Sequence, residues 1–314
     1  MSRLQPDTGK RHCAAVGFFD GVHLGHASLM RQLKDTAESR GETALAITFD
    51  RHPRTVIQSG FIPELLTTTE EKRRLLTAAG ADECLILPFN KQLASMTARE
   101  FLEMVRDTYQ VHTLLVGYDH RFGRPQGETF ADYERMGREI GIDVLHGEPF
   151  LVDDVPVSSS RIRRSLTEGR VDEAKRLLGR PYSFQATVIH GHHVGHSLGF
   201  PTANFDVAGL PCILPANGSY LVQTTVPPNS QRPTRKSSGM LYIGTRPTFE
   251  GSERTAEVHL FDTDADLYGL TLRVEFLWRL REERHFDSPE ALRRQLTDDR
   301  EQALRIIRKT VSES

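Results

Sequence analysis

The chain has 314 residues, more than one hydrophobic core usually holds, so two domains are expected. Hydrophobic residues make up 38% and charged residues 26%, which excludes wholesale disorder. Forty lysines and arginines against 42 acidic residues give a net charge of −2, which argues against a protein that coats nucleic acid.

Short apolar runs alternate with helical periodicity through the first half of the chain. Strand-like runs occur at 13–18, 44–49, 84–87, 113–117 and 143–145, with helical segments at 23–40, 70–79, 97–105 and 133–140. Thr97 and Glu100 have the spacing of a capping box. This alternation predicts an α/β fold, a doubly wound parallel sheet with helices on both faces and ligands at the carboxyl ends of its strands.

The second half changes its period after two short helices predicted at 159–166 and 171–178. Strand-like runs follow at 184–189, 220–226, 240–243, 257–261 and 272–277, separated by glycine- and proline-rich turns. They predict a small antiparallel β-barrel, with a polar loop at 227–236 and a C-terminal amphipathic helix at 289–307. We therefore expect one domain at 1–178, including the linker helices, and a second at 179–314.

Nothing in the sequence predicts export or membrane insertion. No apolar run approaches the roughly 20 residues that span a bilayer, and the first residues lack the apolar core of a signal peptide. Cys13, Cys84 and Cys212 lie far apart without metal-type spacing, which predicts buried thiols in a reducing compartment. We expect a cytoplasmic protein without a membrane or nucleic-acid partner.

The sequence GFFDGVHLGH follows the first predicted strand and opens the first helix. Gly17 and Gly21 permit a tight turn, and Gly25 allows a ligand to approach the backbone. Free N–H groups at a helix start favour phosphate, and His23 and His26 are close enough along the helix to face one bound group. The pattern favours phosphoryl or nucleotidyl transfer. Two surface histidines, or half of a metal site, are the alternatives.

The same segment carries a family resemblance. GFFDGVHLGH resembles the signature G-x-F-D-G-x-H-x-G-H of the HxGH nucleotidyltransferases, and the chain as a whole is similar to the bacterial bifunctional riboflavin kinase/FAD synthetase family. Three further segments match in order: TFDRHPR at 48–54, LLVGYDHRFG at 114–123 and VSSSRIRRSL at 157–166. The resemblance covers nearly the whole chain and implies a Rossmann-like HxGH nucleotidyltransferase domain followed by a riboflavin-kinase-type barrel.

In the first domain the resemblance implies a site of adenylyl transfer. His23 and His26 would contact the ATP phosphates and the transition state, and Asp20 would shape the loop. The other ATP-binding residues that it implies are Gly17, Phe19, Gly25, Ser159, Ser160 and Arg163. Asp119 and Arg121 would line the flavin side. Solvated surface charges are the alternative for Arg121 and Arg163.

In the second domain GHHVGHSLGFPTANFD, at 191–206, resembles the G-x-x-x-G-R-x-L-G-F-P-T-A-N segment of riboflavin kinases. Gly195, Thr202 and Asn204 would bind ATP, and Phe200 would contact flavin. The Thr202 hydroxyl and the Asn204 amide oxygen are hard, neutral ligands that suit Mg²⁺. Phosphate would balance the metal charge, so we expect Mg²⁺ to bind well only with nucleotide. A histidine cluster at 190, 192, 193 and 196 matches no closed zinc pattern.

Glu257 lies in TAEVHLFD, where alternation puts Ala256 and Val258 on one face of a strand and Glu257 on the other. A solvent-facing carboxylate is the ordinary interpretation. The resemblance implies a catalytic base instead, which would take a proton from the ribityl hydroxyl. Arg281 and Phe286, in WRLREERHFDS, are flavin-contact candidates, with core or surface roles as alternatives.

These assignments predict an enzyme that phosphorylates riboflavin to FMN with ATP and then adenylylates FMN to FAD, releasing pyrophosphate. It would need Mg²⁺ and small-molecule substrates only, as a monomer or weak homo-oligomer. Four residues depart from the family pattern: Arg51, His120, His196 and Tyr242. One rival is another HxGH transferase, against which the GFPTAN barrel argues. A second is a flavin-binding or regulatory protein with a decayed kinase half.

Overall fold

A computed structural model of the chain describes residues 9–118, 121–123, 127–190, 199–228, 234–248, 251–261 and 267–312. The chain divides into two compact units, a first unit of residues 1–159 and a second unit of residues 160–314. The linker helices α7 (Ser159–Thr167) and α8 (Val171–Leu178) fall in the second unit, apart from Ser159. The predicted domain boundary at 178/179 stays a prediction.

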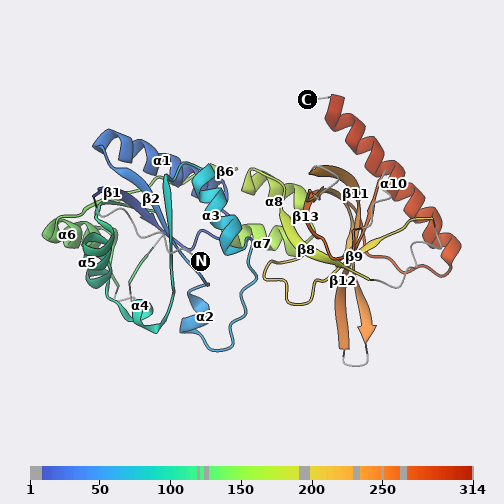
Figure 1. Cartoon of the computed structure of the whole chain (residues 1–314), viewed down its shortest axis with the longest axis horizontal. Coiled ribbons are helices and arrows are strands. Elements are labelled where there is room, and N and C mark those ends of the chain that lie inside the picture. The colour runs from blue at the N-terminus through green and yellow to red at the C-terminus, as the bar shows by residue number, and fades with distance from the viewer. Residues whose placement is uncertain are drawn as a thin grey trace. The chain divides into compact units, whose positions relative to one another are not determined.

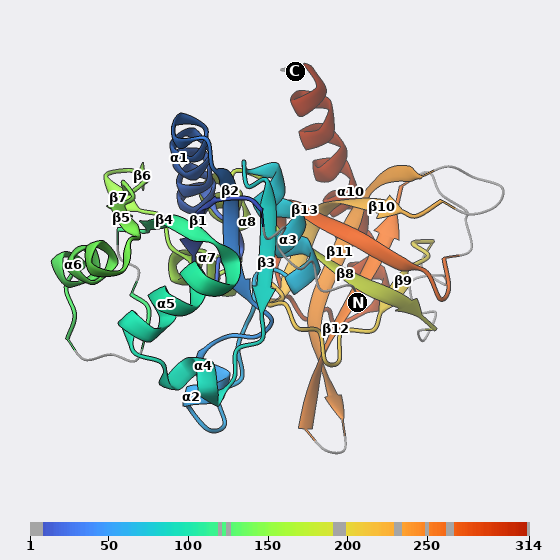
Figure 2. The ribbon, with the colours of Figure 1, turned by 60° about the vertical axis from the view of Figure 1, so that its left-hand side comes forward.

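The first unit is built on a five-stranded parallel sheet, whose strands lie side by side in Figure 2. The strands are β1 (His12–Val16), β2 (Thr43–Phe49), β3 (Glu83–Leu87), β4 (Val111–Val116) and β5 (Asp143–His146). Their order is β3-β2-β1-β4-β5, so the order reverses between β1 and β4. The predicted parallel sheet is therefore confirmed, and its carboxyl edge next to β1 is the place where such sheets bind ligands.

Helices cover both faces of this sheet, as predicted. They are α1 (Leu24–Arg40), α2 (Arg54–Ile57), α3 (Thr69–Ala78), α4 (Lys91–Ser95), α5 (Ala98–Tyr109) and α6 (Phe130–Ile140); a hairpin, β6 (Leu151–Val152) and β7 (Val155–Pro156), follows. Ala14 and Val16 lie in one buried cluster with residues of α5, while Cys13 and Ala15 lie in another with residues of α1. Successive side chains of β1 therefore pack into two different hydrophobic cores, one on each face of the sheet. The predicted capping box at Thr97 is present.

The second unit contains a closed barrel with the order β10-β11-β12-β9-β8-β13 and antiparallel pairing (Figure 1). Its strands are β8 (Ser183–Ile189), β9 (Ala203–Phe205), β10 (Gly218–Val226), β11 (Arg235–Thr248), β12 (Gly251–Leu260) and β13 (Thr271–Glu282). The predicted barrel is confirmed. The loop predicted at 227–236 ends earlier than expected, because Arg235 and Lys236 already belong to β11 and pair with β10. The three-residue strand β9 was not predicted.

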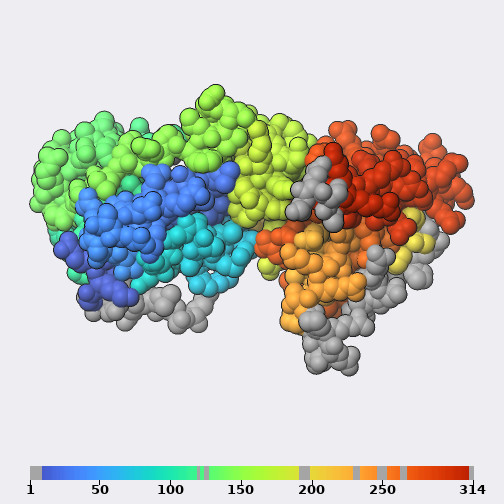
Figure 3. Space-filling view, turned by 90° about the horizontal axis from the view of Figure 1, so that it is seen from above, coloured from blue at the N-terminus to red at the C-terminus, as the bar shows by residue number. Residues whose placement is uncertain are grey.

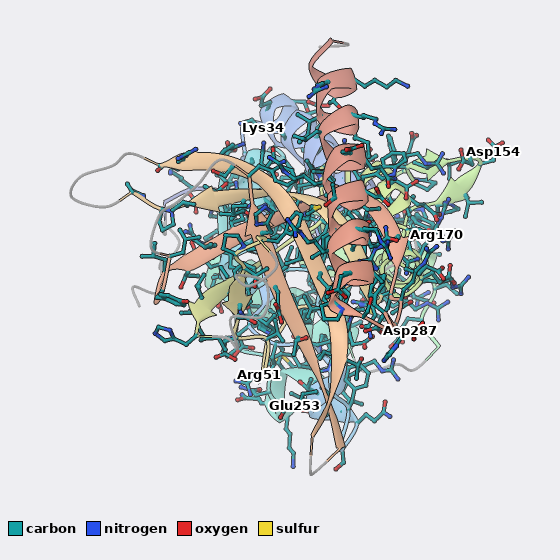
Figure 4. All side chains as sticks on the ribbon, turned by 90° about the vertical axis from the view of Figure 1, so that its right-hand side faces the viewer. Lys34, Arg51, Asp154, Arg170, Glu253 and Asp287 are labelled. Carbon is teal, nitrogen blue, oxygen red and sulfur yellow. The ribbon has the colours of Figure 1, made fainter. Side chains whose placement is uncertain are left out.

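The last helix, α10 (Pro289–Ser312), lies against the barrel, as the amphipathic pattern predicted. Figures 1 and 4 show it running across the strands, and Figure 3 shows it in red on the surface of the second unit. Ala303 on this helix is fully buried and belongs to one cluster with Leu221, Met240 and Phe261 of the barrel. The helix therefore closes an apolar outer face of the barrel.

Two further predictions concern the whole chain. All three cysteines are buried free thiols, as expected. In the part of the chain that the structure describes, we find no helix with the length and apolarity needed to cross a membrane. The cytoplasmic location stays a prediction.

Candidate active sites

The loop between β1 and α1 has a strained backbone. Phe19 has φ of 52°, Gly21 of 81° and Val22 of 39°. Positive φ suits glycine, but it is costly for a β-branched residue such as valine. Strain of this kind persists only where surrounding contacts fix it, and it concentrates at functional sites. The loop that carries the histidine motif is therefore held in one particular geometry.

The Asp20 side chain supplies the main anchor of this loop. Its carboxylate accepts hydrogen bonds from the backbone N–H of Leu66, at 2.9 Å, and of Thr67, at 3.2 Å. Gly21 N–H donates to the Thr67 hydroxyl at 3.0 Å, and the Ser159 hydroxyl donates to the Asp20 carbonyl at 2.9 Å. The structure thus brings Asp20 and Ser159 together, and their predicted roles in ATP binding stay predictions. Sequence reasoning missed Thr67, because no pattern links it to the loop.

His23 and His26 lie together at the start of α1. His23 caps the helix, since its Nδ1 accepts the His26 backbone N–H at 3.3 Å, and the two rings stack with centroids 3.6 Å apart. The Phe19 ring meets the His26 ring edge-on at 5.2 Å. A Cβ on Gly25 would lie 3.1 Å from the His23 ring, and one on Gly17 would lie 2.7 Å from the Phe19 ring. A side chain at position 17 would therefore displace the Phe19 ring, whereas one at position 25 would crowd the His23 ring.

Residues 17–23, between β1 and α1, are called the histidine loop below. The loop after β2 lies beside it. The His52 ring meets the Phe18 ring edge-on, with centroids 4.8 Å apart. Arg51, which replaces the family's proline, pairs with Asp50 and lies on the outside of the unit in Figure 4. Phe89 N–H donates to the Asp50 carboxylate at 2.9 Å. The loops that follow β1, β2 and β3 therefore meet at one edge of the sheet.

The remaining candidates of the adenylylation site are Ser160, Arg163, Arg121 and Asp119. Ser160 is exposed at the start of α7, Arg163 is half-buried one turn further on, and Arg121 is exposed. Asp119 and His120 lie outside the described residues. The roles predicted for these five residues stay predictions.

The kinase candidates come together on the outer face of two barrel strands. Asn204 of β9 pairs in register with Glu257 of β12, and the Thr202 hydroxyl donates to the Glu257 carboxylate at 3.2 Å. Ala256 and Val258 are buried in the barrel, while Glu257 is only half-buried. The faces predicted for this strand are confirmed.

This group of side chains fits a magnesium ion by its chemistry. The Thr202 hydroxyl and the Asn204 amide oxygen are hard oxygen donors of the kind that Mg²⁺ prefers, and the Glu257 carboxylate lies beside them. Within the described ranges, no three or more His, Cys, Asp or Glu side chains gather in a way that could hold a metal ion. Gly195 and the histidines at 192, 193 and 196 fall outside those ranges.

Tyr242, where the family has asparagine, is the neighbour of Glu257 on β11, because the two residues pair in register. Its hydroxyl donates to the Glu283 carboxylate at 2.8 Å, and Asn217 donates to the same carboxylate at 2.9 Å. Burial, together with the Glu283 charge, raises the pKa of Tyr242 well above its usual range, so the phenol stays neutral. Sequence reasoning missed the Glu283 and Asn217 contacts.

The flavin candidates of the second unit lie around the start of β9 and the end of β13. The Phe200 ring meets His259 edge-on at 5.3 Å, and His259 donates from Nδ1 to the Pro201 carbonyl. Arg281 forms a buried ion pair with Asp299 of α10, with Nε and Oδ2 2.8 Å apart. The Arg281 guanidinium also lies 5.5 Å from the Phe286 ring centroid. The structure thus gives Arg281 a partner within the protein, and its flavin role stays a prediction.

Two family models match the chain side by side. The model described as FAD synthetase matches residues 5–161, and the one described as riboflavin kinase matches residues 178–307. The first contains the histidine loop and the second contains the Thr202–Glu257 pair. Fold, sites and matches together define a class of enzyme, a nucleotide-dependent transferase in which an α/β unit precedes a flavokinase barrel.

Relatives of the whole chain carry both functions in their names. A bifunctional riboflavin kinase/FMN adenylyltransferase of Escherichia coli is 32% identical over 90% of this chain and 89% of its own length. The Bacillus subtilis enzyme of the same name is 32% identical over 93% and 91%. The chain therefore belongs to the bifunctional riboflavin kinase/FMN adenylyltransferase family.

A solved structure is similar to this chain over both units. It is a crystal structure described as a macrolide-efflux protein from Streptococcus pneumoniae, with a TM-score of 0.84 and 30% identity, covering 95% of this chain and 96% of that one. The word efflux belongs to the description of the Streptococcus pneumoniae protein and is not applied to this chain. What the two chains share is the fold of both units.

Proposed function

We propose that this chain makes FMN and then FAD. Its barrel transfers the γ-phosphoryl group of ATP to riboflavin, and its α/β unit transfers an adenylyl group from a second ATP to FMN, releasing pyrophosphate. The observation that carries the proposal is the succession of two family matches on one chain, each around its own polar site. We assign adenylylation to residues 1–178 and phosphorylation to residues 179–314.

In the barrel, the geometry supports Glu257 as the general base. Its carboxylate would take the proton of the ribityl hydroxyl while that oxygen attacks the γ-phosphorus of ATP. The hydrogen bond from Thr202 orients the carboxylate, and Asn204 lies beside it in register. Tyr242 stays neutral next to Glu257, so it adds no negative charge to the site.

In the α/β unit, His23 and His26 would stabilise the charge that develops on the α-phosphate as FMN oxygen displaces pyrophosphate. The stacked rings present two imidazoles at the start of α1, where the helix dipole also favours phosphate. Asp20 contributes by holding the loop, because its carboxylate is already engaged by backbone N–H groups. No covalent enzyme intermediate is needed in either step.

The predicted metal dependence belongs to the same proposal. When bound, Mg²⁺ would balance phosphate charge at both sites, and in the barrel Thr202 and Asn204 would provide its protein ligands. Both are neutral, so we expect weak binding of Mg²⁺ alone and at least tenfold tighter binding with a non-hydrolysable ATP analogue. Calorimetric titration measures this, with Thr202→Val as the variant that loses the gain. Equal affinity with and without the nucleotide would contradict the assignment.

The decisive experiment follows the flavins over time. Purified protein is incubated with riboflavin, ATP and Mg²⁺, and the flavins are separated by chromatography. FMN that appears first and FAD that follows, with ADP and pyrophosphate, is the expected result. FAD formed only from supplied FMN would refute the kinase half, and flavin binding without turnover would favour a regulatory protein. Sedimentation of the same sample tests the predicted monomer or weak homo-oligomer.

A further inference from the structure

Lys72, on the first turn of α3, is a buried lysine that none of the roles above uses. It is 2% exposed, and its ammonium donates to the Phe49 carbonyl at 2.9 Å. The same ammonium lies 4.0 Å from the centroid of the Phe18 ring. Phe49 is the last residue of β2, and Phe18 belongs to the histidine loop. One positive charge thus touches both loops that meet at the carboxyl edge of the sheet.

A lysine in this position is costly. Lysine is rarely buried fully, and an ammonium loses most of its hydration there, whereas leucine or methionine would fill the same space without that cost. The two contacts that Lys72 makes are both charge-dependent, a hydrogen bond from a cation and a cation–π contact. A buried charge that joins two segments of a candidate site is a reason to look for a role in that site.

The surroundings of Lys72 are also those of the loop anchor. Asp20 lies in its electrostatic neighbourhood, and so do Asp50 and Cys84. Asp20 holds the residues just before α3, and the edge of the Phe18 ring meets His52 of the next loop. The histidine loop is therefore tied to the α3 region twice, through the Asp20 carboxylate and through the Lys72 ammonium.

We propose that Lys72 is a positioning residue for adenylyl transfer, whose charged form fixes the histidine loop against the end of β2. The inference rests on the function proposed above for the first unit. Lys72 does not touch substrate, because its side chain is buried; it acts through Phe18 and Phe49. Burial lowers the pKa of Lys72 to about 8, so above that pH the amine becomes neutral, which removes the cation–π contact with Phe18 and weakens the hydrogen bond to Phe49.

Three variants of the full chain test the proposal. Lys72→Met keeps the length of the side chain and removes the charge, and Lys72→Arg keeps the charge at every pH used. Lys10→Met is the matched control, because Lys10 forms an exposed ion pair with Glu83 at the opposite end of the sheet. Kinase turnover of riboflavin by the same molecules reports whether the chain is otherwise intact.

At pH 7 we expect Lys72→Met to lower kcat for FMN adenylylation about tenfold, with KM for ATP within about twofold and kinase turnover unchanged. The ratio of wild-type to Lys72→Met kcat should fall from pH 7 to pH 9.5, because the wild type loses the same charge. Lys72→Arg keeps its charge over that range, so its activity relative to Lys10→Met should not change from pH 7 to pH 9.5. A ratio that is constant with pH, or an unchanged kcat, would overturn the proposal.

A second readout does not depend on turnover. Hydrogen exchange of peptides covering 17–23 and 49–54 should be about tenfold faster in Lys72→Met than in Lys10→Met at pH 7. Equal exchange in the two variants would also overturn the proposal. If the wild type formed no FAD while the exchange differed as expected, the proposed function would fail and the positioning of the loop by Lys72 would stand.

Discussion

The two sites of this enzyme are built in opposite ways. In the first unit the candidate side chains His23 and His26 lie at the end of a strained loop, and single side chains such as Asp20 hold that loop to distant segments. In the second unit Asn204 and Glu257 are placed by the register of two adjacent strands. A strand register is fixed by backbone hydrogen bonds along its length, whereas a loop depends on the few groups that contact it.

The difference predicts where each activity is vulnerable. Adenylylation should respond to substitutions of buried residues that touch no substrate, because they change the loop. Phosphorylation should respond mainly to substitutions of the polar side chains themselves. Since both activities belong to one chain, each serves as an internal control for the other, and a variant that lowers only one cannot be explained by general unfolding.

The largest effect is expected from Glu257→Gln, which keeps the shape of the side chain and removes its basicity. Riboflavin phosphorylation should fall by about 10²–10⁴-fold, while FAD formation from supplied FMN should be unchanged. Glu253→Gln is the matched control, because Glu253 is an exposed carboxylate on the same strand. Steady-state rates with each flavin measure both steps. If Glu257→Gln still phosphorylated riboflavin, Glu257 would not be the general base, although the pairing of β9 with β12 places it next to Asn204.

The corresponding variant of the first unit is His26→Asn, which removes one imidazole from the stacked pair at the start of α1. Loss of a group that stabilises transition-state charge typically costs about 10²–10³-fold in rate. FMN adenylylation should fall by that amount and riboflavin phosphorylation should not change. His112→Asn is the control in the same unit, because His112 is the second residue of β4 and lies at the opposite end of the sheet from the histidine loop. A parallel fall of both activities would mean that His26 supports the fold rather than the reaction.

The sequence predicted the elements whose residues follow a simple period. A short apolar run located β1, and alternation around Glu257 assigned the two faces of β12 correctly. Strand β9 was not predicted, because three residues are too few to show a period. Asn204 of this strand and Thr202 just before it were identified from their motif, but the hydrogen bond from Thr202 to Glu257 follows only from the closure of the barrel.

The contacts that anchor the first site could not be predicted in the same way. Thr67 meets Asp20 across 47 residues of sequence, and no local pattern contains that contact. Lys72 did carry one signal, because it lies four residues before the buried Leu76 on the same face of a helix. Charged residues are normally assigned to the solvent face, so this position in an apolar stripe was not recognised.

The smallest expected effect concerns the stability of the first unit. The pKa of Lys72 is about 8 in the folded protein against 10.5 for the ordinary side chain, because burial disfavours the charge. Between those values the unfolded chain binds more protons, so stability rises with pH there. From pH 7 to pH 9 the wild type should gain about 1 kcal/mol relative to Lys72→Met.

Other groups do not obscure this difference. Burial raises the pKa of Cys84 to about 11, and a raised thiol pKa lowers stability once the unfolded thiol ionises, which is the opposite sign. The Lys72 charge lowers the pKa of Cys84, but up to pH 9 the folded thiol stays protonated with or without that charge, so the effect cancels between the wild type and Lys72→Met. Urea unfolding at the two pH values, followed by hydrogen exchange in α3 for the first unit and by the single tryptophan, Trp278, for the second, measures the two units separately. The Lys72 difference should be confined to the first, and equal shifts in both units would mean that the barrel, too, depends on this buried charge.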